Sequence, residues 1–222
     1  MLRKHKRLTR KELKQDPLVI FAAQTFDYLR TEWIKIVSCV VGVALVISVT
    51  YFVVQGKKKS EINAFDLALT ALSSNAPEAL DLMDTYVAKY SKSKNAPWML
   101  LQLGNHYFAE KDYIMAEKYY LTFVDGSNNN QVFDFNAYNG LGAVYEETGD
   151  FIKAGEIYEK YASRYRNSAF TSMMYLNAGK AYVLAGRAED ALRNFNKIIQ
   201  QYGDSTEKQE ALFYSEMLNT SS

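Results

Sequence analysis

The residue types that most often do chemistry in enzymes are few in this 222-residue chain and far apart. It has one cysteine, Cys39, and two histidines, His5 and His106. A single cysteine cannot form an internal disulfide bond or a zinc site built from several thiolates. The adjacent carboxylates of Glu146 and Glu147 would point apart, because neighbouring residues do not share a helix face. Since no glycine-rich phosphate loop is present either, we expect no catalytic, metal or cofactor site.

A pattern of small and aromatic residues recurs at a spacing of 37 or 38 residues. In each copy a glycine stands three residues before a tyrosine, and an alanine follows the glycine by twelve residues. A more distant copy starts near Ser60, with Ala79 at the alanine position and Leu67 in place of the glycine. Such a period is typical of stacked helical repeats. The three clear copies hold Gly104, Tyr107 and Ala116; Gly142, Tyr145 and Ala154; and Gly179, Tyr182 and Ala191.

Each copy predicts a pair of antiparallel helices whose small residues leave room where the helices cross. Gly149 and Gly186 would form a left-handed turn between the helices of a pair. In another copy Lys111 stands where these turn glycines stand, so we expect that turn to be built differently. Three of the four units close with a Tyr-x-x-Ser motif, and its serine is expected to cap the following helix. These serines are Ser93, Ser168 and Ser205.

These residues resemble the tetratricopeptide repeat (TPR) family over about residues 60–205. The family places small residues at the glycine and alanine positions and an aromatic residue at the tyrosine position. The sequence departs from the family because Leu100, Tyr138 and Tyr175 replace its early tryptophan and its closing proline is absent. The resemblance implies an all-α fold. We expect a right-handed superhelix of about four TPR-like helix pairs, the first degenerate, closed by a capping helix over Thr206–Asn219.

The formal net charge of +1 is the sum of three unlike segments. Residues 1–35 hold nine Lys/Arg and four Asp/Glu, residues 36–54 hold no charge, and Lys57–Lys59 add three positive charges. Residues 60–222 hold 14 basic and 21 acidic residues, a balance of −7. This order predicts four regions. They are a basic cytoplasmic tail over 1–16, an amphipathic helix over 17–35, a transmembrane helix over 36–55 and a TPR-like domain over 56–222.

The uncharged segment would span ~30 Å as a helix, which is the thickness of a bilayer core. A cleaved signal peptide is the alternative, but its apolar core is usually only ~7–15 residues long. Ile36–Cys39 resembles a lipobox, yet the apolar core follows this cysteine instead of preceding it. Because more Lys/Arg precede the span than follow it, we expect a cytoplasmic N-terminus and a periplasmic C-terminal domain. Lys57–Lys59 oppose this orientation.

The tail carries signals of its own. Thr9 and Glu12 form a capping-box pattern. From Pro17 onward, four large apolar residues recur along one side of the expected helix. They could dock on a membrane or on a membrane partner, or the tail could act only as a topology signal. The four residues are Phe21, Phe26, Leu29 and Trp33.

The inner face of such a superhelix is lined mainly by the first helix of each pair. Its positions here are mostly apolar, which suits a hydrophobic segment of a partner protein. Alternatively, the capping helix with Ala211, Leu212, Phe213 and Met217 packs there. The predicted partner-binding residues are Trp98, Leu101, Asn105, Phe108, Asn139, Met173, Leu176, Lys180, Val183 and Leu184.

The combined features predict a non-enzymatic, membrane-anchored scaffold of the bacterial inner membrane. Its partners would be proteins such as a translocon, a periplasmic chaperone or a translocated client, and not nucleic acid. The layout also resembles the YfgM-type ancillary subunits of the Sec translocon. The alternative is a membrane-anchored receptor or assembly factor that faces the cytoplasm.

Overall fold

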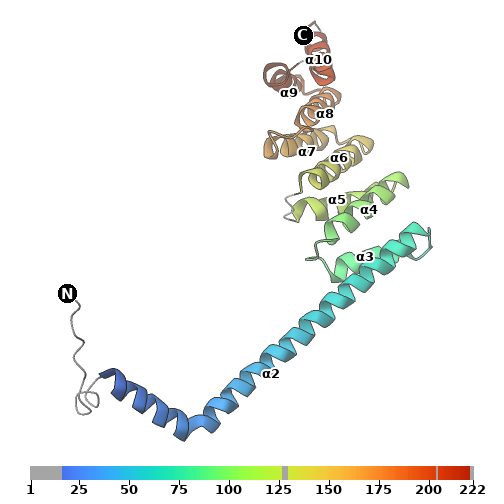
Figure 1. Cartoon of the computed structure of the whole chain (residues 1–222). Coiled ribbons are helices and arrows are strands. Elements are labelled where there is room, and N and C mark those ends of the chain that lie inside the picture. The colour runs from blue at the N-terminus through green and yellow to red at the C-terminus, as the bar shows by residue number, and fades with distance from the viewer. Residues whose placement is uncertain (1–16, 127–129, 204, 221–222) are drawn as a thin grey trace, which may run out of the picture. The chain divides into compact units, whose positions relative to one another are not determined.

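The computed structural model describes residues 17–126, 130–203 and 205–220, and every regular element in these ranges is an α-helix (Figure 1). The chain divides into two compact units, Met1–Ser60 and Glu61–Ser222. The second unit therefore begins at the place where the repeat pattern predicts the first, degenerate helix pair. The expected basic tail over 1–16, with its Thr9–Glu12 capping box, lies outside the described residues.

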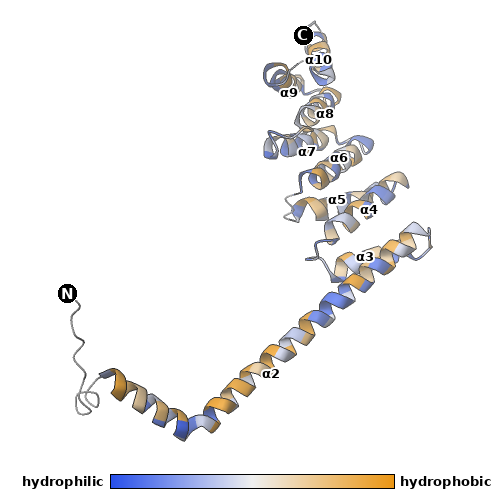
Figure 2. Ribbon diagram, viewed as in Figure 1, coloured by the Kyte–Doolittle hydropathy of each residue, from blue (hydrophilic) through white to orange (hydrophobic). Residues whose placement is uncertain are grey.

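The first unit contains most of helix α2, which runs from Pro17 to Ser73 as one helix of 57 residues. Its uncharged stretch is a continuous apolar band, coloured orange in Figure 2. By length and composition α2 could cross a membrane, and none of its most apolar 18-residue window is buried. The hydroxyls of Ser38, Ser48 and Thr50 each donate a hydrogen bond to the carbonyl four residues earlier. These three hydroxyls are thus satisfied within the helix, as an apolar solvent requires.

The second unit is a row of antiparallel helix pairs. The part of α2 that follows Ser60 packs on α3 (Ala79–Lys89). Helix α10 (Thr206–Thr220) follows the last pair and packs on α8 and α9. The three pairs between them are α4 (Ala96–Ala109) with α5 (Tyr113–Asp125), α6 (Gln131–Glu147) with α7 (Phe151–Arg164), and α8 (Thr171–Leu184) with α9 (Ala188–Gln201).

The repeated glycines make room for aromatic rings of the second helix. A Cβ atom added to Gly142 would lie 2.3 Å from the ring of Tyr158, and one added to Gly179 would lie 2.3 Å from the ring of Phe195. Gly104 has the same relation to Tyr120. Such distances are far below van der Waals contact, so a larger residue at these positions would displace the ring. The small residues therefore let a side chain lie flat on the helix backbone.

The turns between paired helices are all built in the same way. Gly149 and Gly186 have positive φ, as expected, but so do Lys111 (φ 61°) and Asn75 (φ 51°). In each turn the next amide donates to the carbonyl five residues earlier, as Asp112 N does to Tyr107 O at 2.9 Å. This is the Schellman arrangement. The expectation of a different turn at Lys111 was wrong, because the hydrogen bonds that close the helix hold a non-glycine residue in the left-handed region.

The serines of the Tyr-x-x-Ser motifs have two different roles. Ser205 accepts a hydrogen bond from Lys208 N at the start of α10, which confirms the capping prediction there. Ser93 and Ser168 do not cap α4 and α8, so the prediction was wrong for both. Their hydroxyls accept from an amide two residues on and lie 2.7 and 3.0 Å from the phenol oxygens of Tyr86 and Tyr161. They satisfy a buried tyrosine instead.

The last helix covers the final repeat with an unexpected face. Ala211 is fully buried, and the ring of Tyr214 stacks on Phe195 with centroids 5.5 Å apart. Leu212, Phe213 and Met217, which the alternative to partner binding placed against the inner face, are exposed. Ala211, Tyr214 and Ser215 share one side of the helix, and the three larger apolar residues lie on another.

Candidate functional site

The residues that could do chemistry stand on separate elements. Cys39 is exposed on α2, and His106 is exposed on α4 beside the ring of Tyr107. On α6, Glu147 accepts a hydrogen bond from Tyr113 Oη at 3.1 Å. Burial raises the pKa of the neighbouring Glu146, which is hydrogen-bonded to a tyrosine of α7. Each of the two glutamates thus has a structural partner.

The predicted partner-binding residues do not form one open groove. Leu101 and Leu176 are buried in the core, whereas Asn105 and Leu184 are exposed. The remaining six are half-buried: Trp98, Phe108, Asn139, Met173, Lys180 and Val183.

Several of these positions already have partners inside the domain. The Asn105 side-chain oxygen accepts a hydrogen bond from Tyr120 Oη at 2.7 Å, and the Trp98 ring lies 6.0 Å from that of Phe65. Lys180 forms an ion pair with Glu210 of α10. At the last repeat, therefore, the capping helix engages a residue that was predicted to bind a partner.

The four predicted docking residues of the tail lie on the first part of α2. All four side chains are exposed, between 47% for Leu29 and 69% for Phe26. They are available for a membrane or a partner, and their binding role stays a prediction. The other two predicted docking residues are Phe21 and Trp33.

A cleft of about 580 Å³ opens where α3, α4 and α5 meet, which we term the first seam. Its lining includes the apolar side chains of Leu100 and Phe123 and the exposed lysines Lys92 and Lys118. Among the lining residues, Tyr119 Oη donates a hydrogen bond to Asp84 Oδ1 at 2.7 Å. The cleft is built largely from second helices and from the turn before α4. It therefore lies away from the first-helix face that the sequence predicted.

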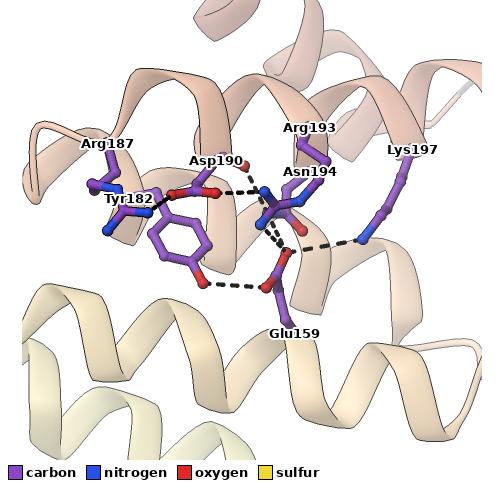
Figure 3. A network of polar contacts seen from close by, with 7 residues as sticks. All are labelled: Glu159, Tyr182, Arg187, Asp190, Arg193, Asn194 and Lys197. Atoms are coloured by element: carbon purple, nitrogen blue, oxygen red, sulfur yellow. Dashed lines mark hydrogen bonds and ion pairs between the residues drawn. The ribbon is translucent and has the colours of Figure 1, made fainter.

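The second seam lies where α7, α8 and α9 meet, and its positions follow the equivalent positions of the first seam by 75 residues. Charged side chains fill it (Figure 3). Glu159 of α7 accepts hydrogen bonds from Asn194 Nδ2 at 2.7 Å and from Arg193 Nη2 at 3.1 Å. Lys197 Nζ lies 3.9 Å from the same oxygen, and the other oxygen accepts from Tyr182 Oη at 3.2 Å.

A matched set of positions explains why the first seam is open and the second is filled. Asp84 and Tyr119 of the first seam stand where Glu159 and Asn194 stand in the second. Leu100 and Thr122, however, correspond to Tyr175 and Lys197, whose ring and amino group lie 4.6 Å apart across the second seam. Lys118 corresponds to Arg193, which is ion-paired. The sequence could have revealed the cleft if all positions of the repeats, and not only the glycines and alanines, had been compared at this 75-residue offset.

Tyrosine hydroxyls bridge neighbouring helices to carboxylates throughout the domain. Burial is the largest cause that raises the pKa of Tyr119, Tyr145 and Tyr182, and the carboxylate that each hydroxyl contacts raises it further. These hydroxyls therefore stay protonated and act as hydrogen-bond donors. Asp134 is the most buried carboxyl described, and desolvation raises its pKa despite the nearby Tyr165 and Arg164. These polar groups hold neighbouring helices and repeats together.

Comparison with known proteins agrees with this architecture. A sequence profile of the tetratricopeptide repeat family matches residues 133–203. No curated protein matches the chain. Of solved structures, a tetratricopeptide repeat protein from Parabacteroides merdae ATCC 43184 aligns with a TM-score of 0.56 and 15% identity. The match covers 73% of this chain and 61% of that one.

A second solved structure, MamA AMB-1, aligns with a TM-score of 0.49 and 20% identity, over 66% of this chain and 76% of that one. At these identities the similarity to the Parabacteroides protein concerns the fold. The prediction of an all-α domain of the tetratricopeptide repeat type, preceded by a long apolar helix, is confirmed.

Proposed function

We propose that this chain is a non-enzymatic scaffold whose repeat domain binds partner proteins and whose helix α2 anchors it in a membrane. Repeat domains of the tetratricopeptide type generally serve as protein-binding scaffolds. The observation that carries the anchor is the uncharged segment Ile36–Val54, in which nearly every side chain is exposed. So long an exposed apolar surface needs to be covered, and a bilayer core matches its length.

The charge order supports a bacterial inner membrane with the repeat domain in the periplasm. Nine Lys/Arg precede the uncharged segment, and they favour retention of the N-terminal side in the cytoplasm. The resemblance of this layout to YfgM-type ancillary translocon subunits supports a translocon, a periplasmic chaperone or a translocated client as the partner. Lys57–Lys59 favour the second candidate, a receptor or assembly factor with its domain in the cytoplasm.

Cysteine labelling separates the two orientations. In a Cys39→Ser background, Asn105→Cys would report on the repeat domain and Thr9→Cys on the tail. With a membrane-impermeant maleimide applied to spheroplasts, we expect Asn105→Cys to react at once and Thr9→Cys only after lysis. The opposite pattern would establish the cytoplasmic alternative. Release of the protein from membranes by alkaline carbonate would refute the anchor.

Partner binding is tested by photo-crosslinking in native membranes. A photoreactive residue at exposed Asn105 or Leu184 of the repeat domain, or at Trp33 of the tail, should give adducts with a translocon subunit, a chaperone or a client. A photoreactive residue at Phe26 would serve as a second probe of the tail. The absence of protein adducts from all of these positions would contradict a scaffold role.

A further inference from the structure

We infer that the open cleft of the first seam binds an acidic segment of a partner protein that inserts a large apolar or aromatic side chain. The inference rests on the proposed protein-binding function and specifies the chemistry of the partner. It concerns a surface that lies outside the predicted first-helix face.

The charges of the cleft favour a negatively charged occupant. Within the described part of the chain, Lys92 and Lys118 have no ion-pair partner, and Lys118 Nζ lies 4.8 Å from the Tyr119 ring centroid. The carboxylate of Asp84, which also lines the cleft, accepts the hydrogen bond from Tyr119 Oη. Residues 60–222 carry a balance of −7, so two unpaired lysines at one cleft oppose the charge of their own domain. Such complementarity selects partners and speeds their association.

The shape of the cleft favours an apolar or aromatic side chain. In the second seam, the ring of Tyr175 and the stem of Lys197 fill the space that Leu100 and Thr122 leave open in the first. Its volume of about 580 Å³ is within the range of ligand pockets. A side chain of a partner can therefore occupy in the first seam the space that Tyr175 and Lys197 occupy in the second.

The position of the two lysines favours a polypeptide. Lys92 comes from the turn between α3 and α4, whereas Lys118 comes from α5. Two cations on different elements suit two carboxylates spaced along an extended or helical segment. A fatty acid, which also combines an apolar body with a carboxylate, offers only one.

Peptide binding to the full chain in a neutral detergent tests the inference. The probe is a short fluorescein-labelled peptide that alternates tyrosine or leucine with glutamate, and binding is read by fluorescence anisotropy. We expect the glutamine version of the peptide to bind at least about tenfold more weakly, because charges of this kind contribute to recognition. Equal binding of both peptides, or binding of neither, would overturn the inference.

Variants of the protein locate the site. Leu100→Tyr with Thr122→Lys should close the cleft as the second seam is closed and abolish peptide binding. Lys92→Glu with Lys118→Glu alters only exposed side chains, so it remains informative if the closed variant does not fold; it should weaken binding about tenfold or more. The matched control is Lys160→Glu, since Lys160 also lies over a tyrosine ring, 5.9 Å from the Tyr138 centroid. It should bind like the wild type, and unchanged binding by the closed variant would overturn the site.

The same assay distinguishes other occupants. Oleate that displaces the peptide equally well from the wild type and from the Lys92→Glu, Lys118→Glu variant would replace the polypeptide assignment with a lipid. Self-association in sedimentation experiments that the closed variant abolishes would assign the cleft to a second copy. Both outcomes overturn the inference. Because purified protein is used, the result does not depend on topology, and photo-crosslinks from Leu184 in the membrane would still support the scaffold if the cleft failed.

Discussion

The two seams of the repeat domain share one backbone plan and differ in what fills it. In both, a carboxylate on an earlier second helix accepts a hydrogen bond from a residue 35 positions later, Tyr119 to Asp84 and Asn194 to Glu159. Around Glu159 the surrounding cations and a tyrosine hydroxyl complete a closed network. Around Asp84 the corresponding positions leave a cleft.

The repeat spacing thus sets the hydrogen bond between the two second helices of each seam. The side chains at a few surrounding positions decide whether a cleft stays open beside it. The second seam pairs its own charges and is a structural joint between repeats. The first seam leaves two lysines and an apolar lining uncovered. Substitutions at matched positions of the two seams can therefore separate structural from binding roles.

The largest expected difference comes from removal of the two carboxylates. Glu159→Ala should lower the free energy of unfolding by about 2 kcal/mol, because buried Asn194 loses its charged acceptor. Asp84→Ala should cost about 1 kcal/mol or less, since Asp84 is exposed and loses one bond. Urea unfolding followed by circular dichroism measures both. Glu159→Gln, which keeps an acceptor, should fall between them, and equal losses at the two seams would contradict the comparison.

The next effect comes from opening the closed seam. Tyr175→Leu with Lys197→Thr should lower stability by about 1.5 kcal/mol, because it leaves a cavity next to the core. The mirror change, Leu100→Tyr with Thr122→Lys, should change stability by less than about 1 kcal/mol, as it adds groups to open space. Thermal unfolding compares them. A large loss from the mirror change would show that the two seams differ in backbone and not only in side chains.

The two seams also show how far the sequence could predict this protein. The repeat period located the helix pairs because Gly104, Gly142 and Gly179 must accommodate a ring, and that requirement is visible in the residues themselves. The left-handed turn at Lys111 could not be read in this way, because hydrogen bonds of the finished turn hold it there. Leu212 suggested an inward face for the last helix, yet burial was decided by the ring of Tyr214 against α9.

The candidate site was harder to predict than the fold. Family resemblance directs attention to the first helices, and Leu101 and Leu176 satisfied the expected pattern as core residues. A cleft arises where residues are smaller than their repeat equivalents, so it depends on a comparison of Leu100 and Thr122 with residues two repeats away. No single segment contains that information.

Asp134, in the first turn of α6, gives a pH-dependent test outside the two seams. Burial raises the native pKa of Asp134 above the usual range, so the folded state holds this proton more tightly than the unfolded chain. Its contribution to stability is present at low pH and is lost as the pH rises through the native pKa. Asp134→Asn should therefore gain stability relative to the wild type as the pH rises above about 4. The exposed Asp125→Asn is the control, and parallel pH profiles for wild type and Asp134→Asn would contradict this.

The smallest expected effect separates the matched cations. Arg193→Met should lower stability by about 0.5 to 1 kcal/mol, because Arg193 is half-exposed and its ion pairs with Glu159 and Asp190 are screened by solvent. Lys118→Met has no ion pair to remove and loses only an exposed contact of its Nζ atom with the Tyr119 ring, so its stability should stay within about 0.5 kcal/mol of wild type. Raised salt should shrink the Arg193 effect and leave the Lys118 effect unchanged. If Lys118→Met were the more destabilising change, the lysine would have a structural role and would not be free to bind a partner.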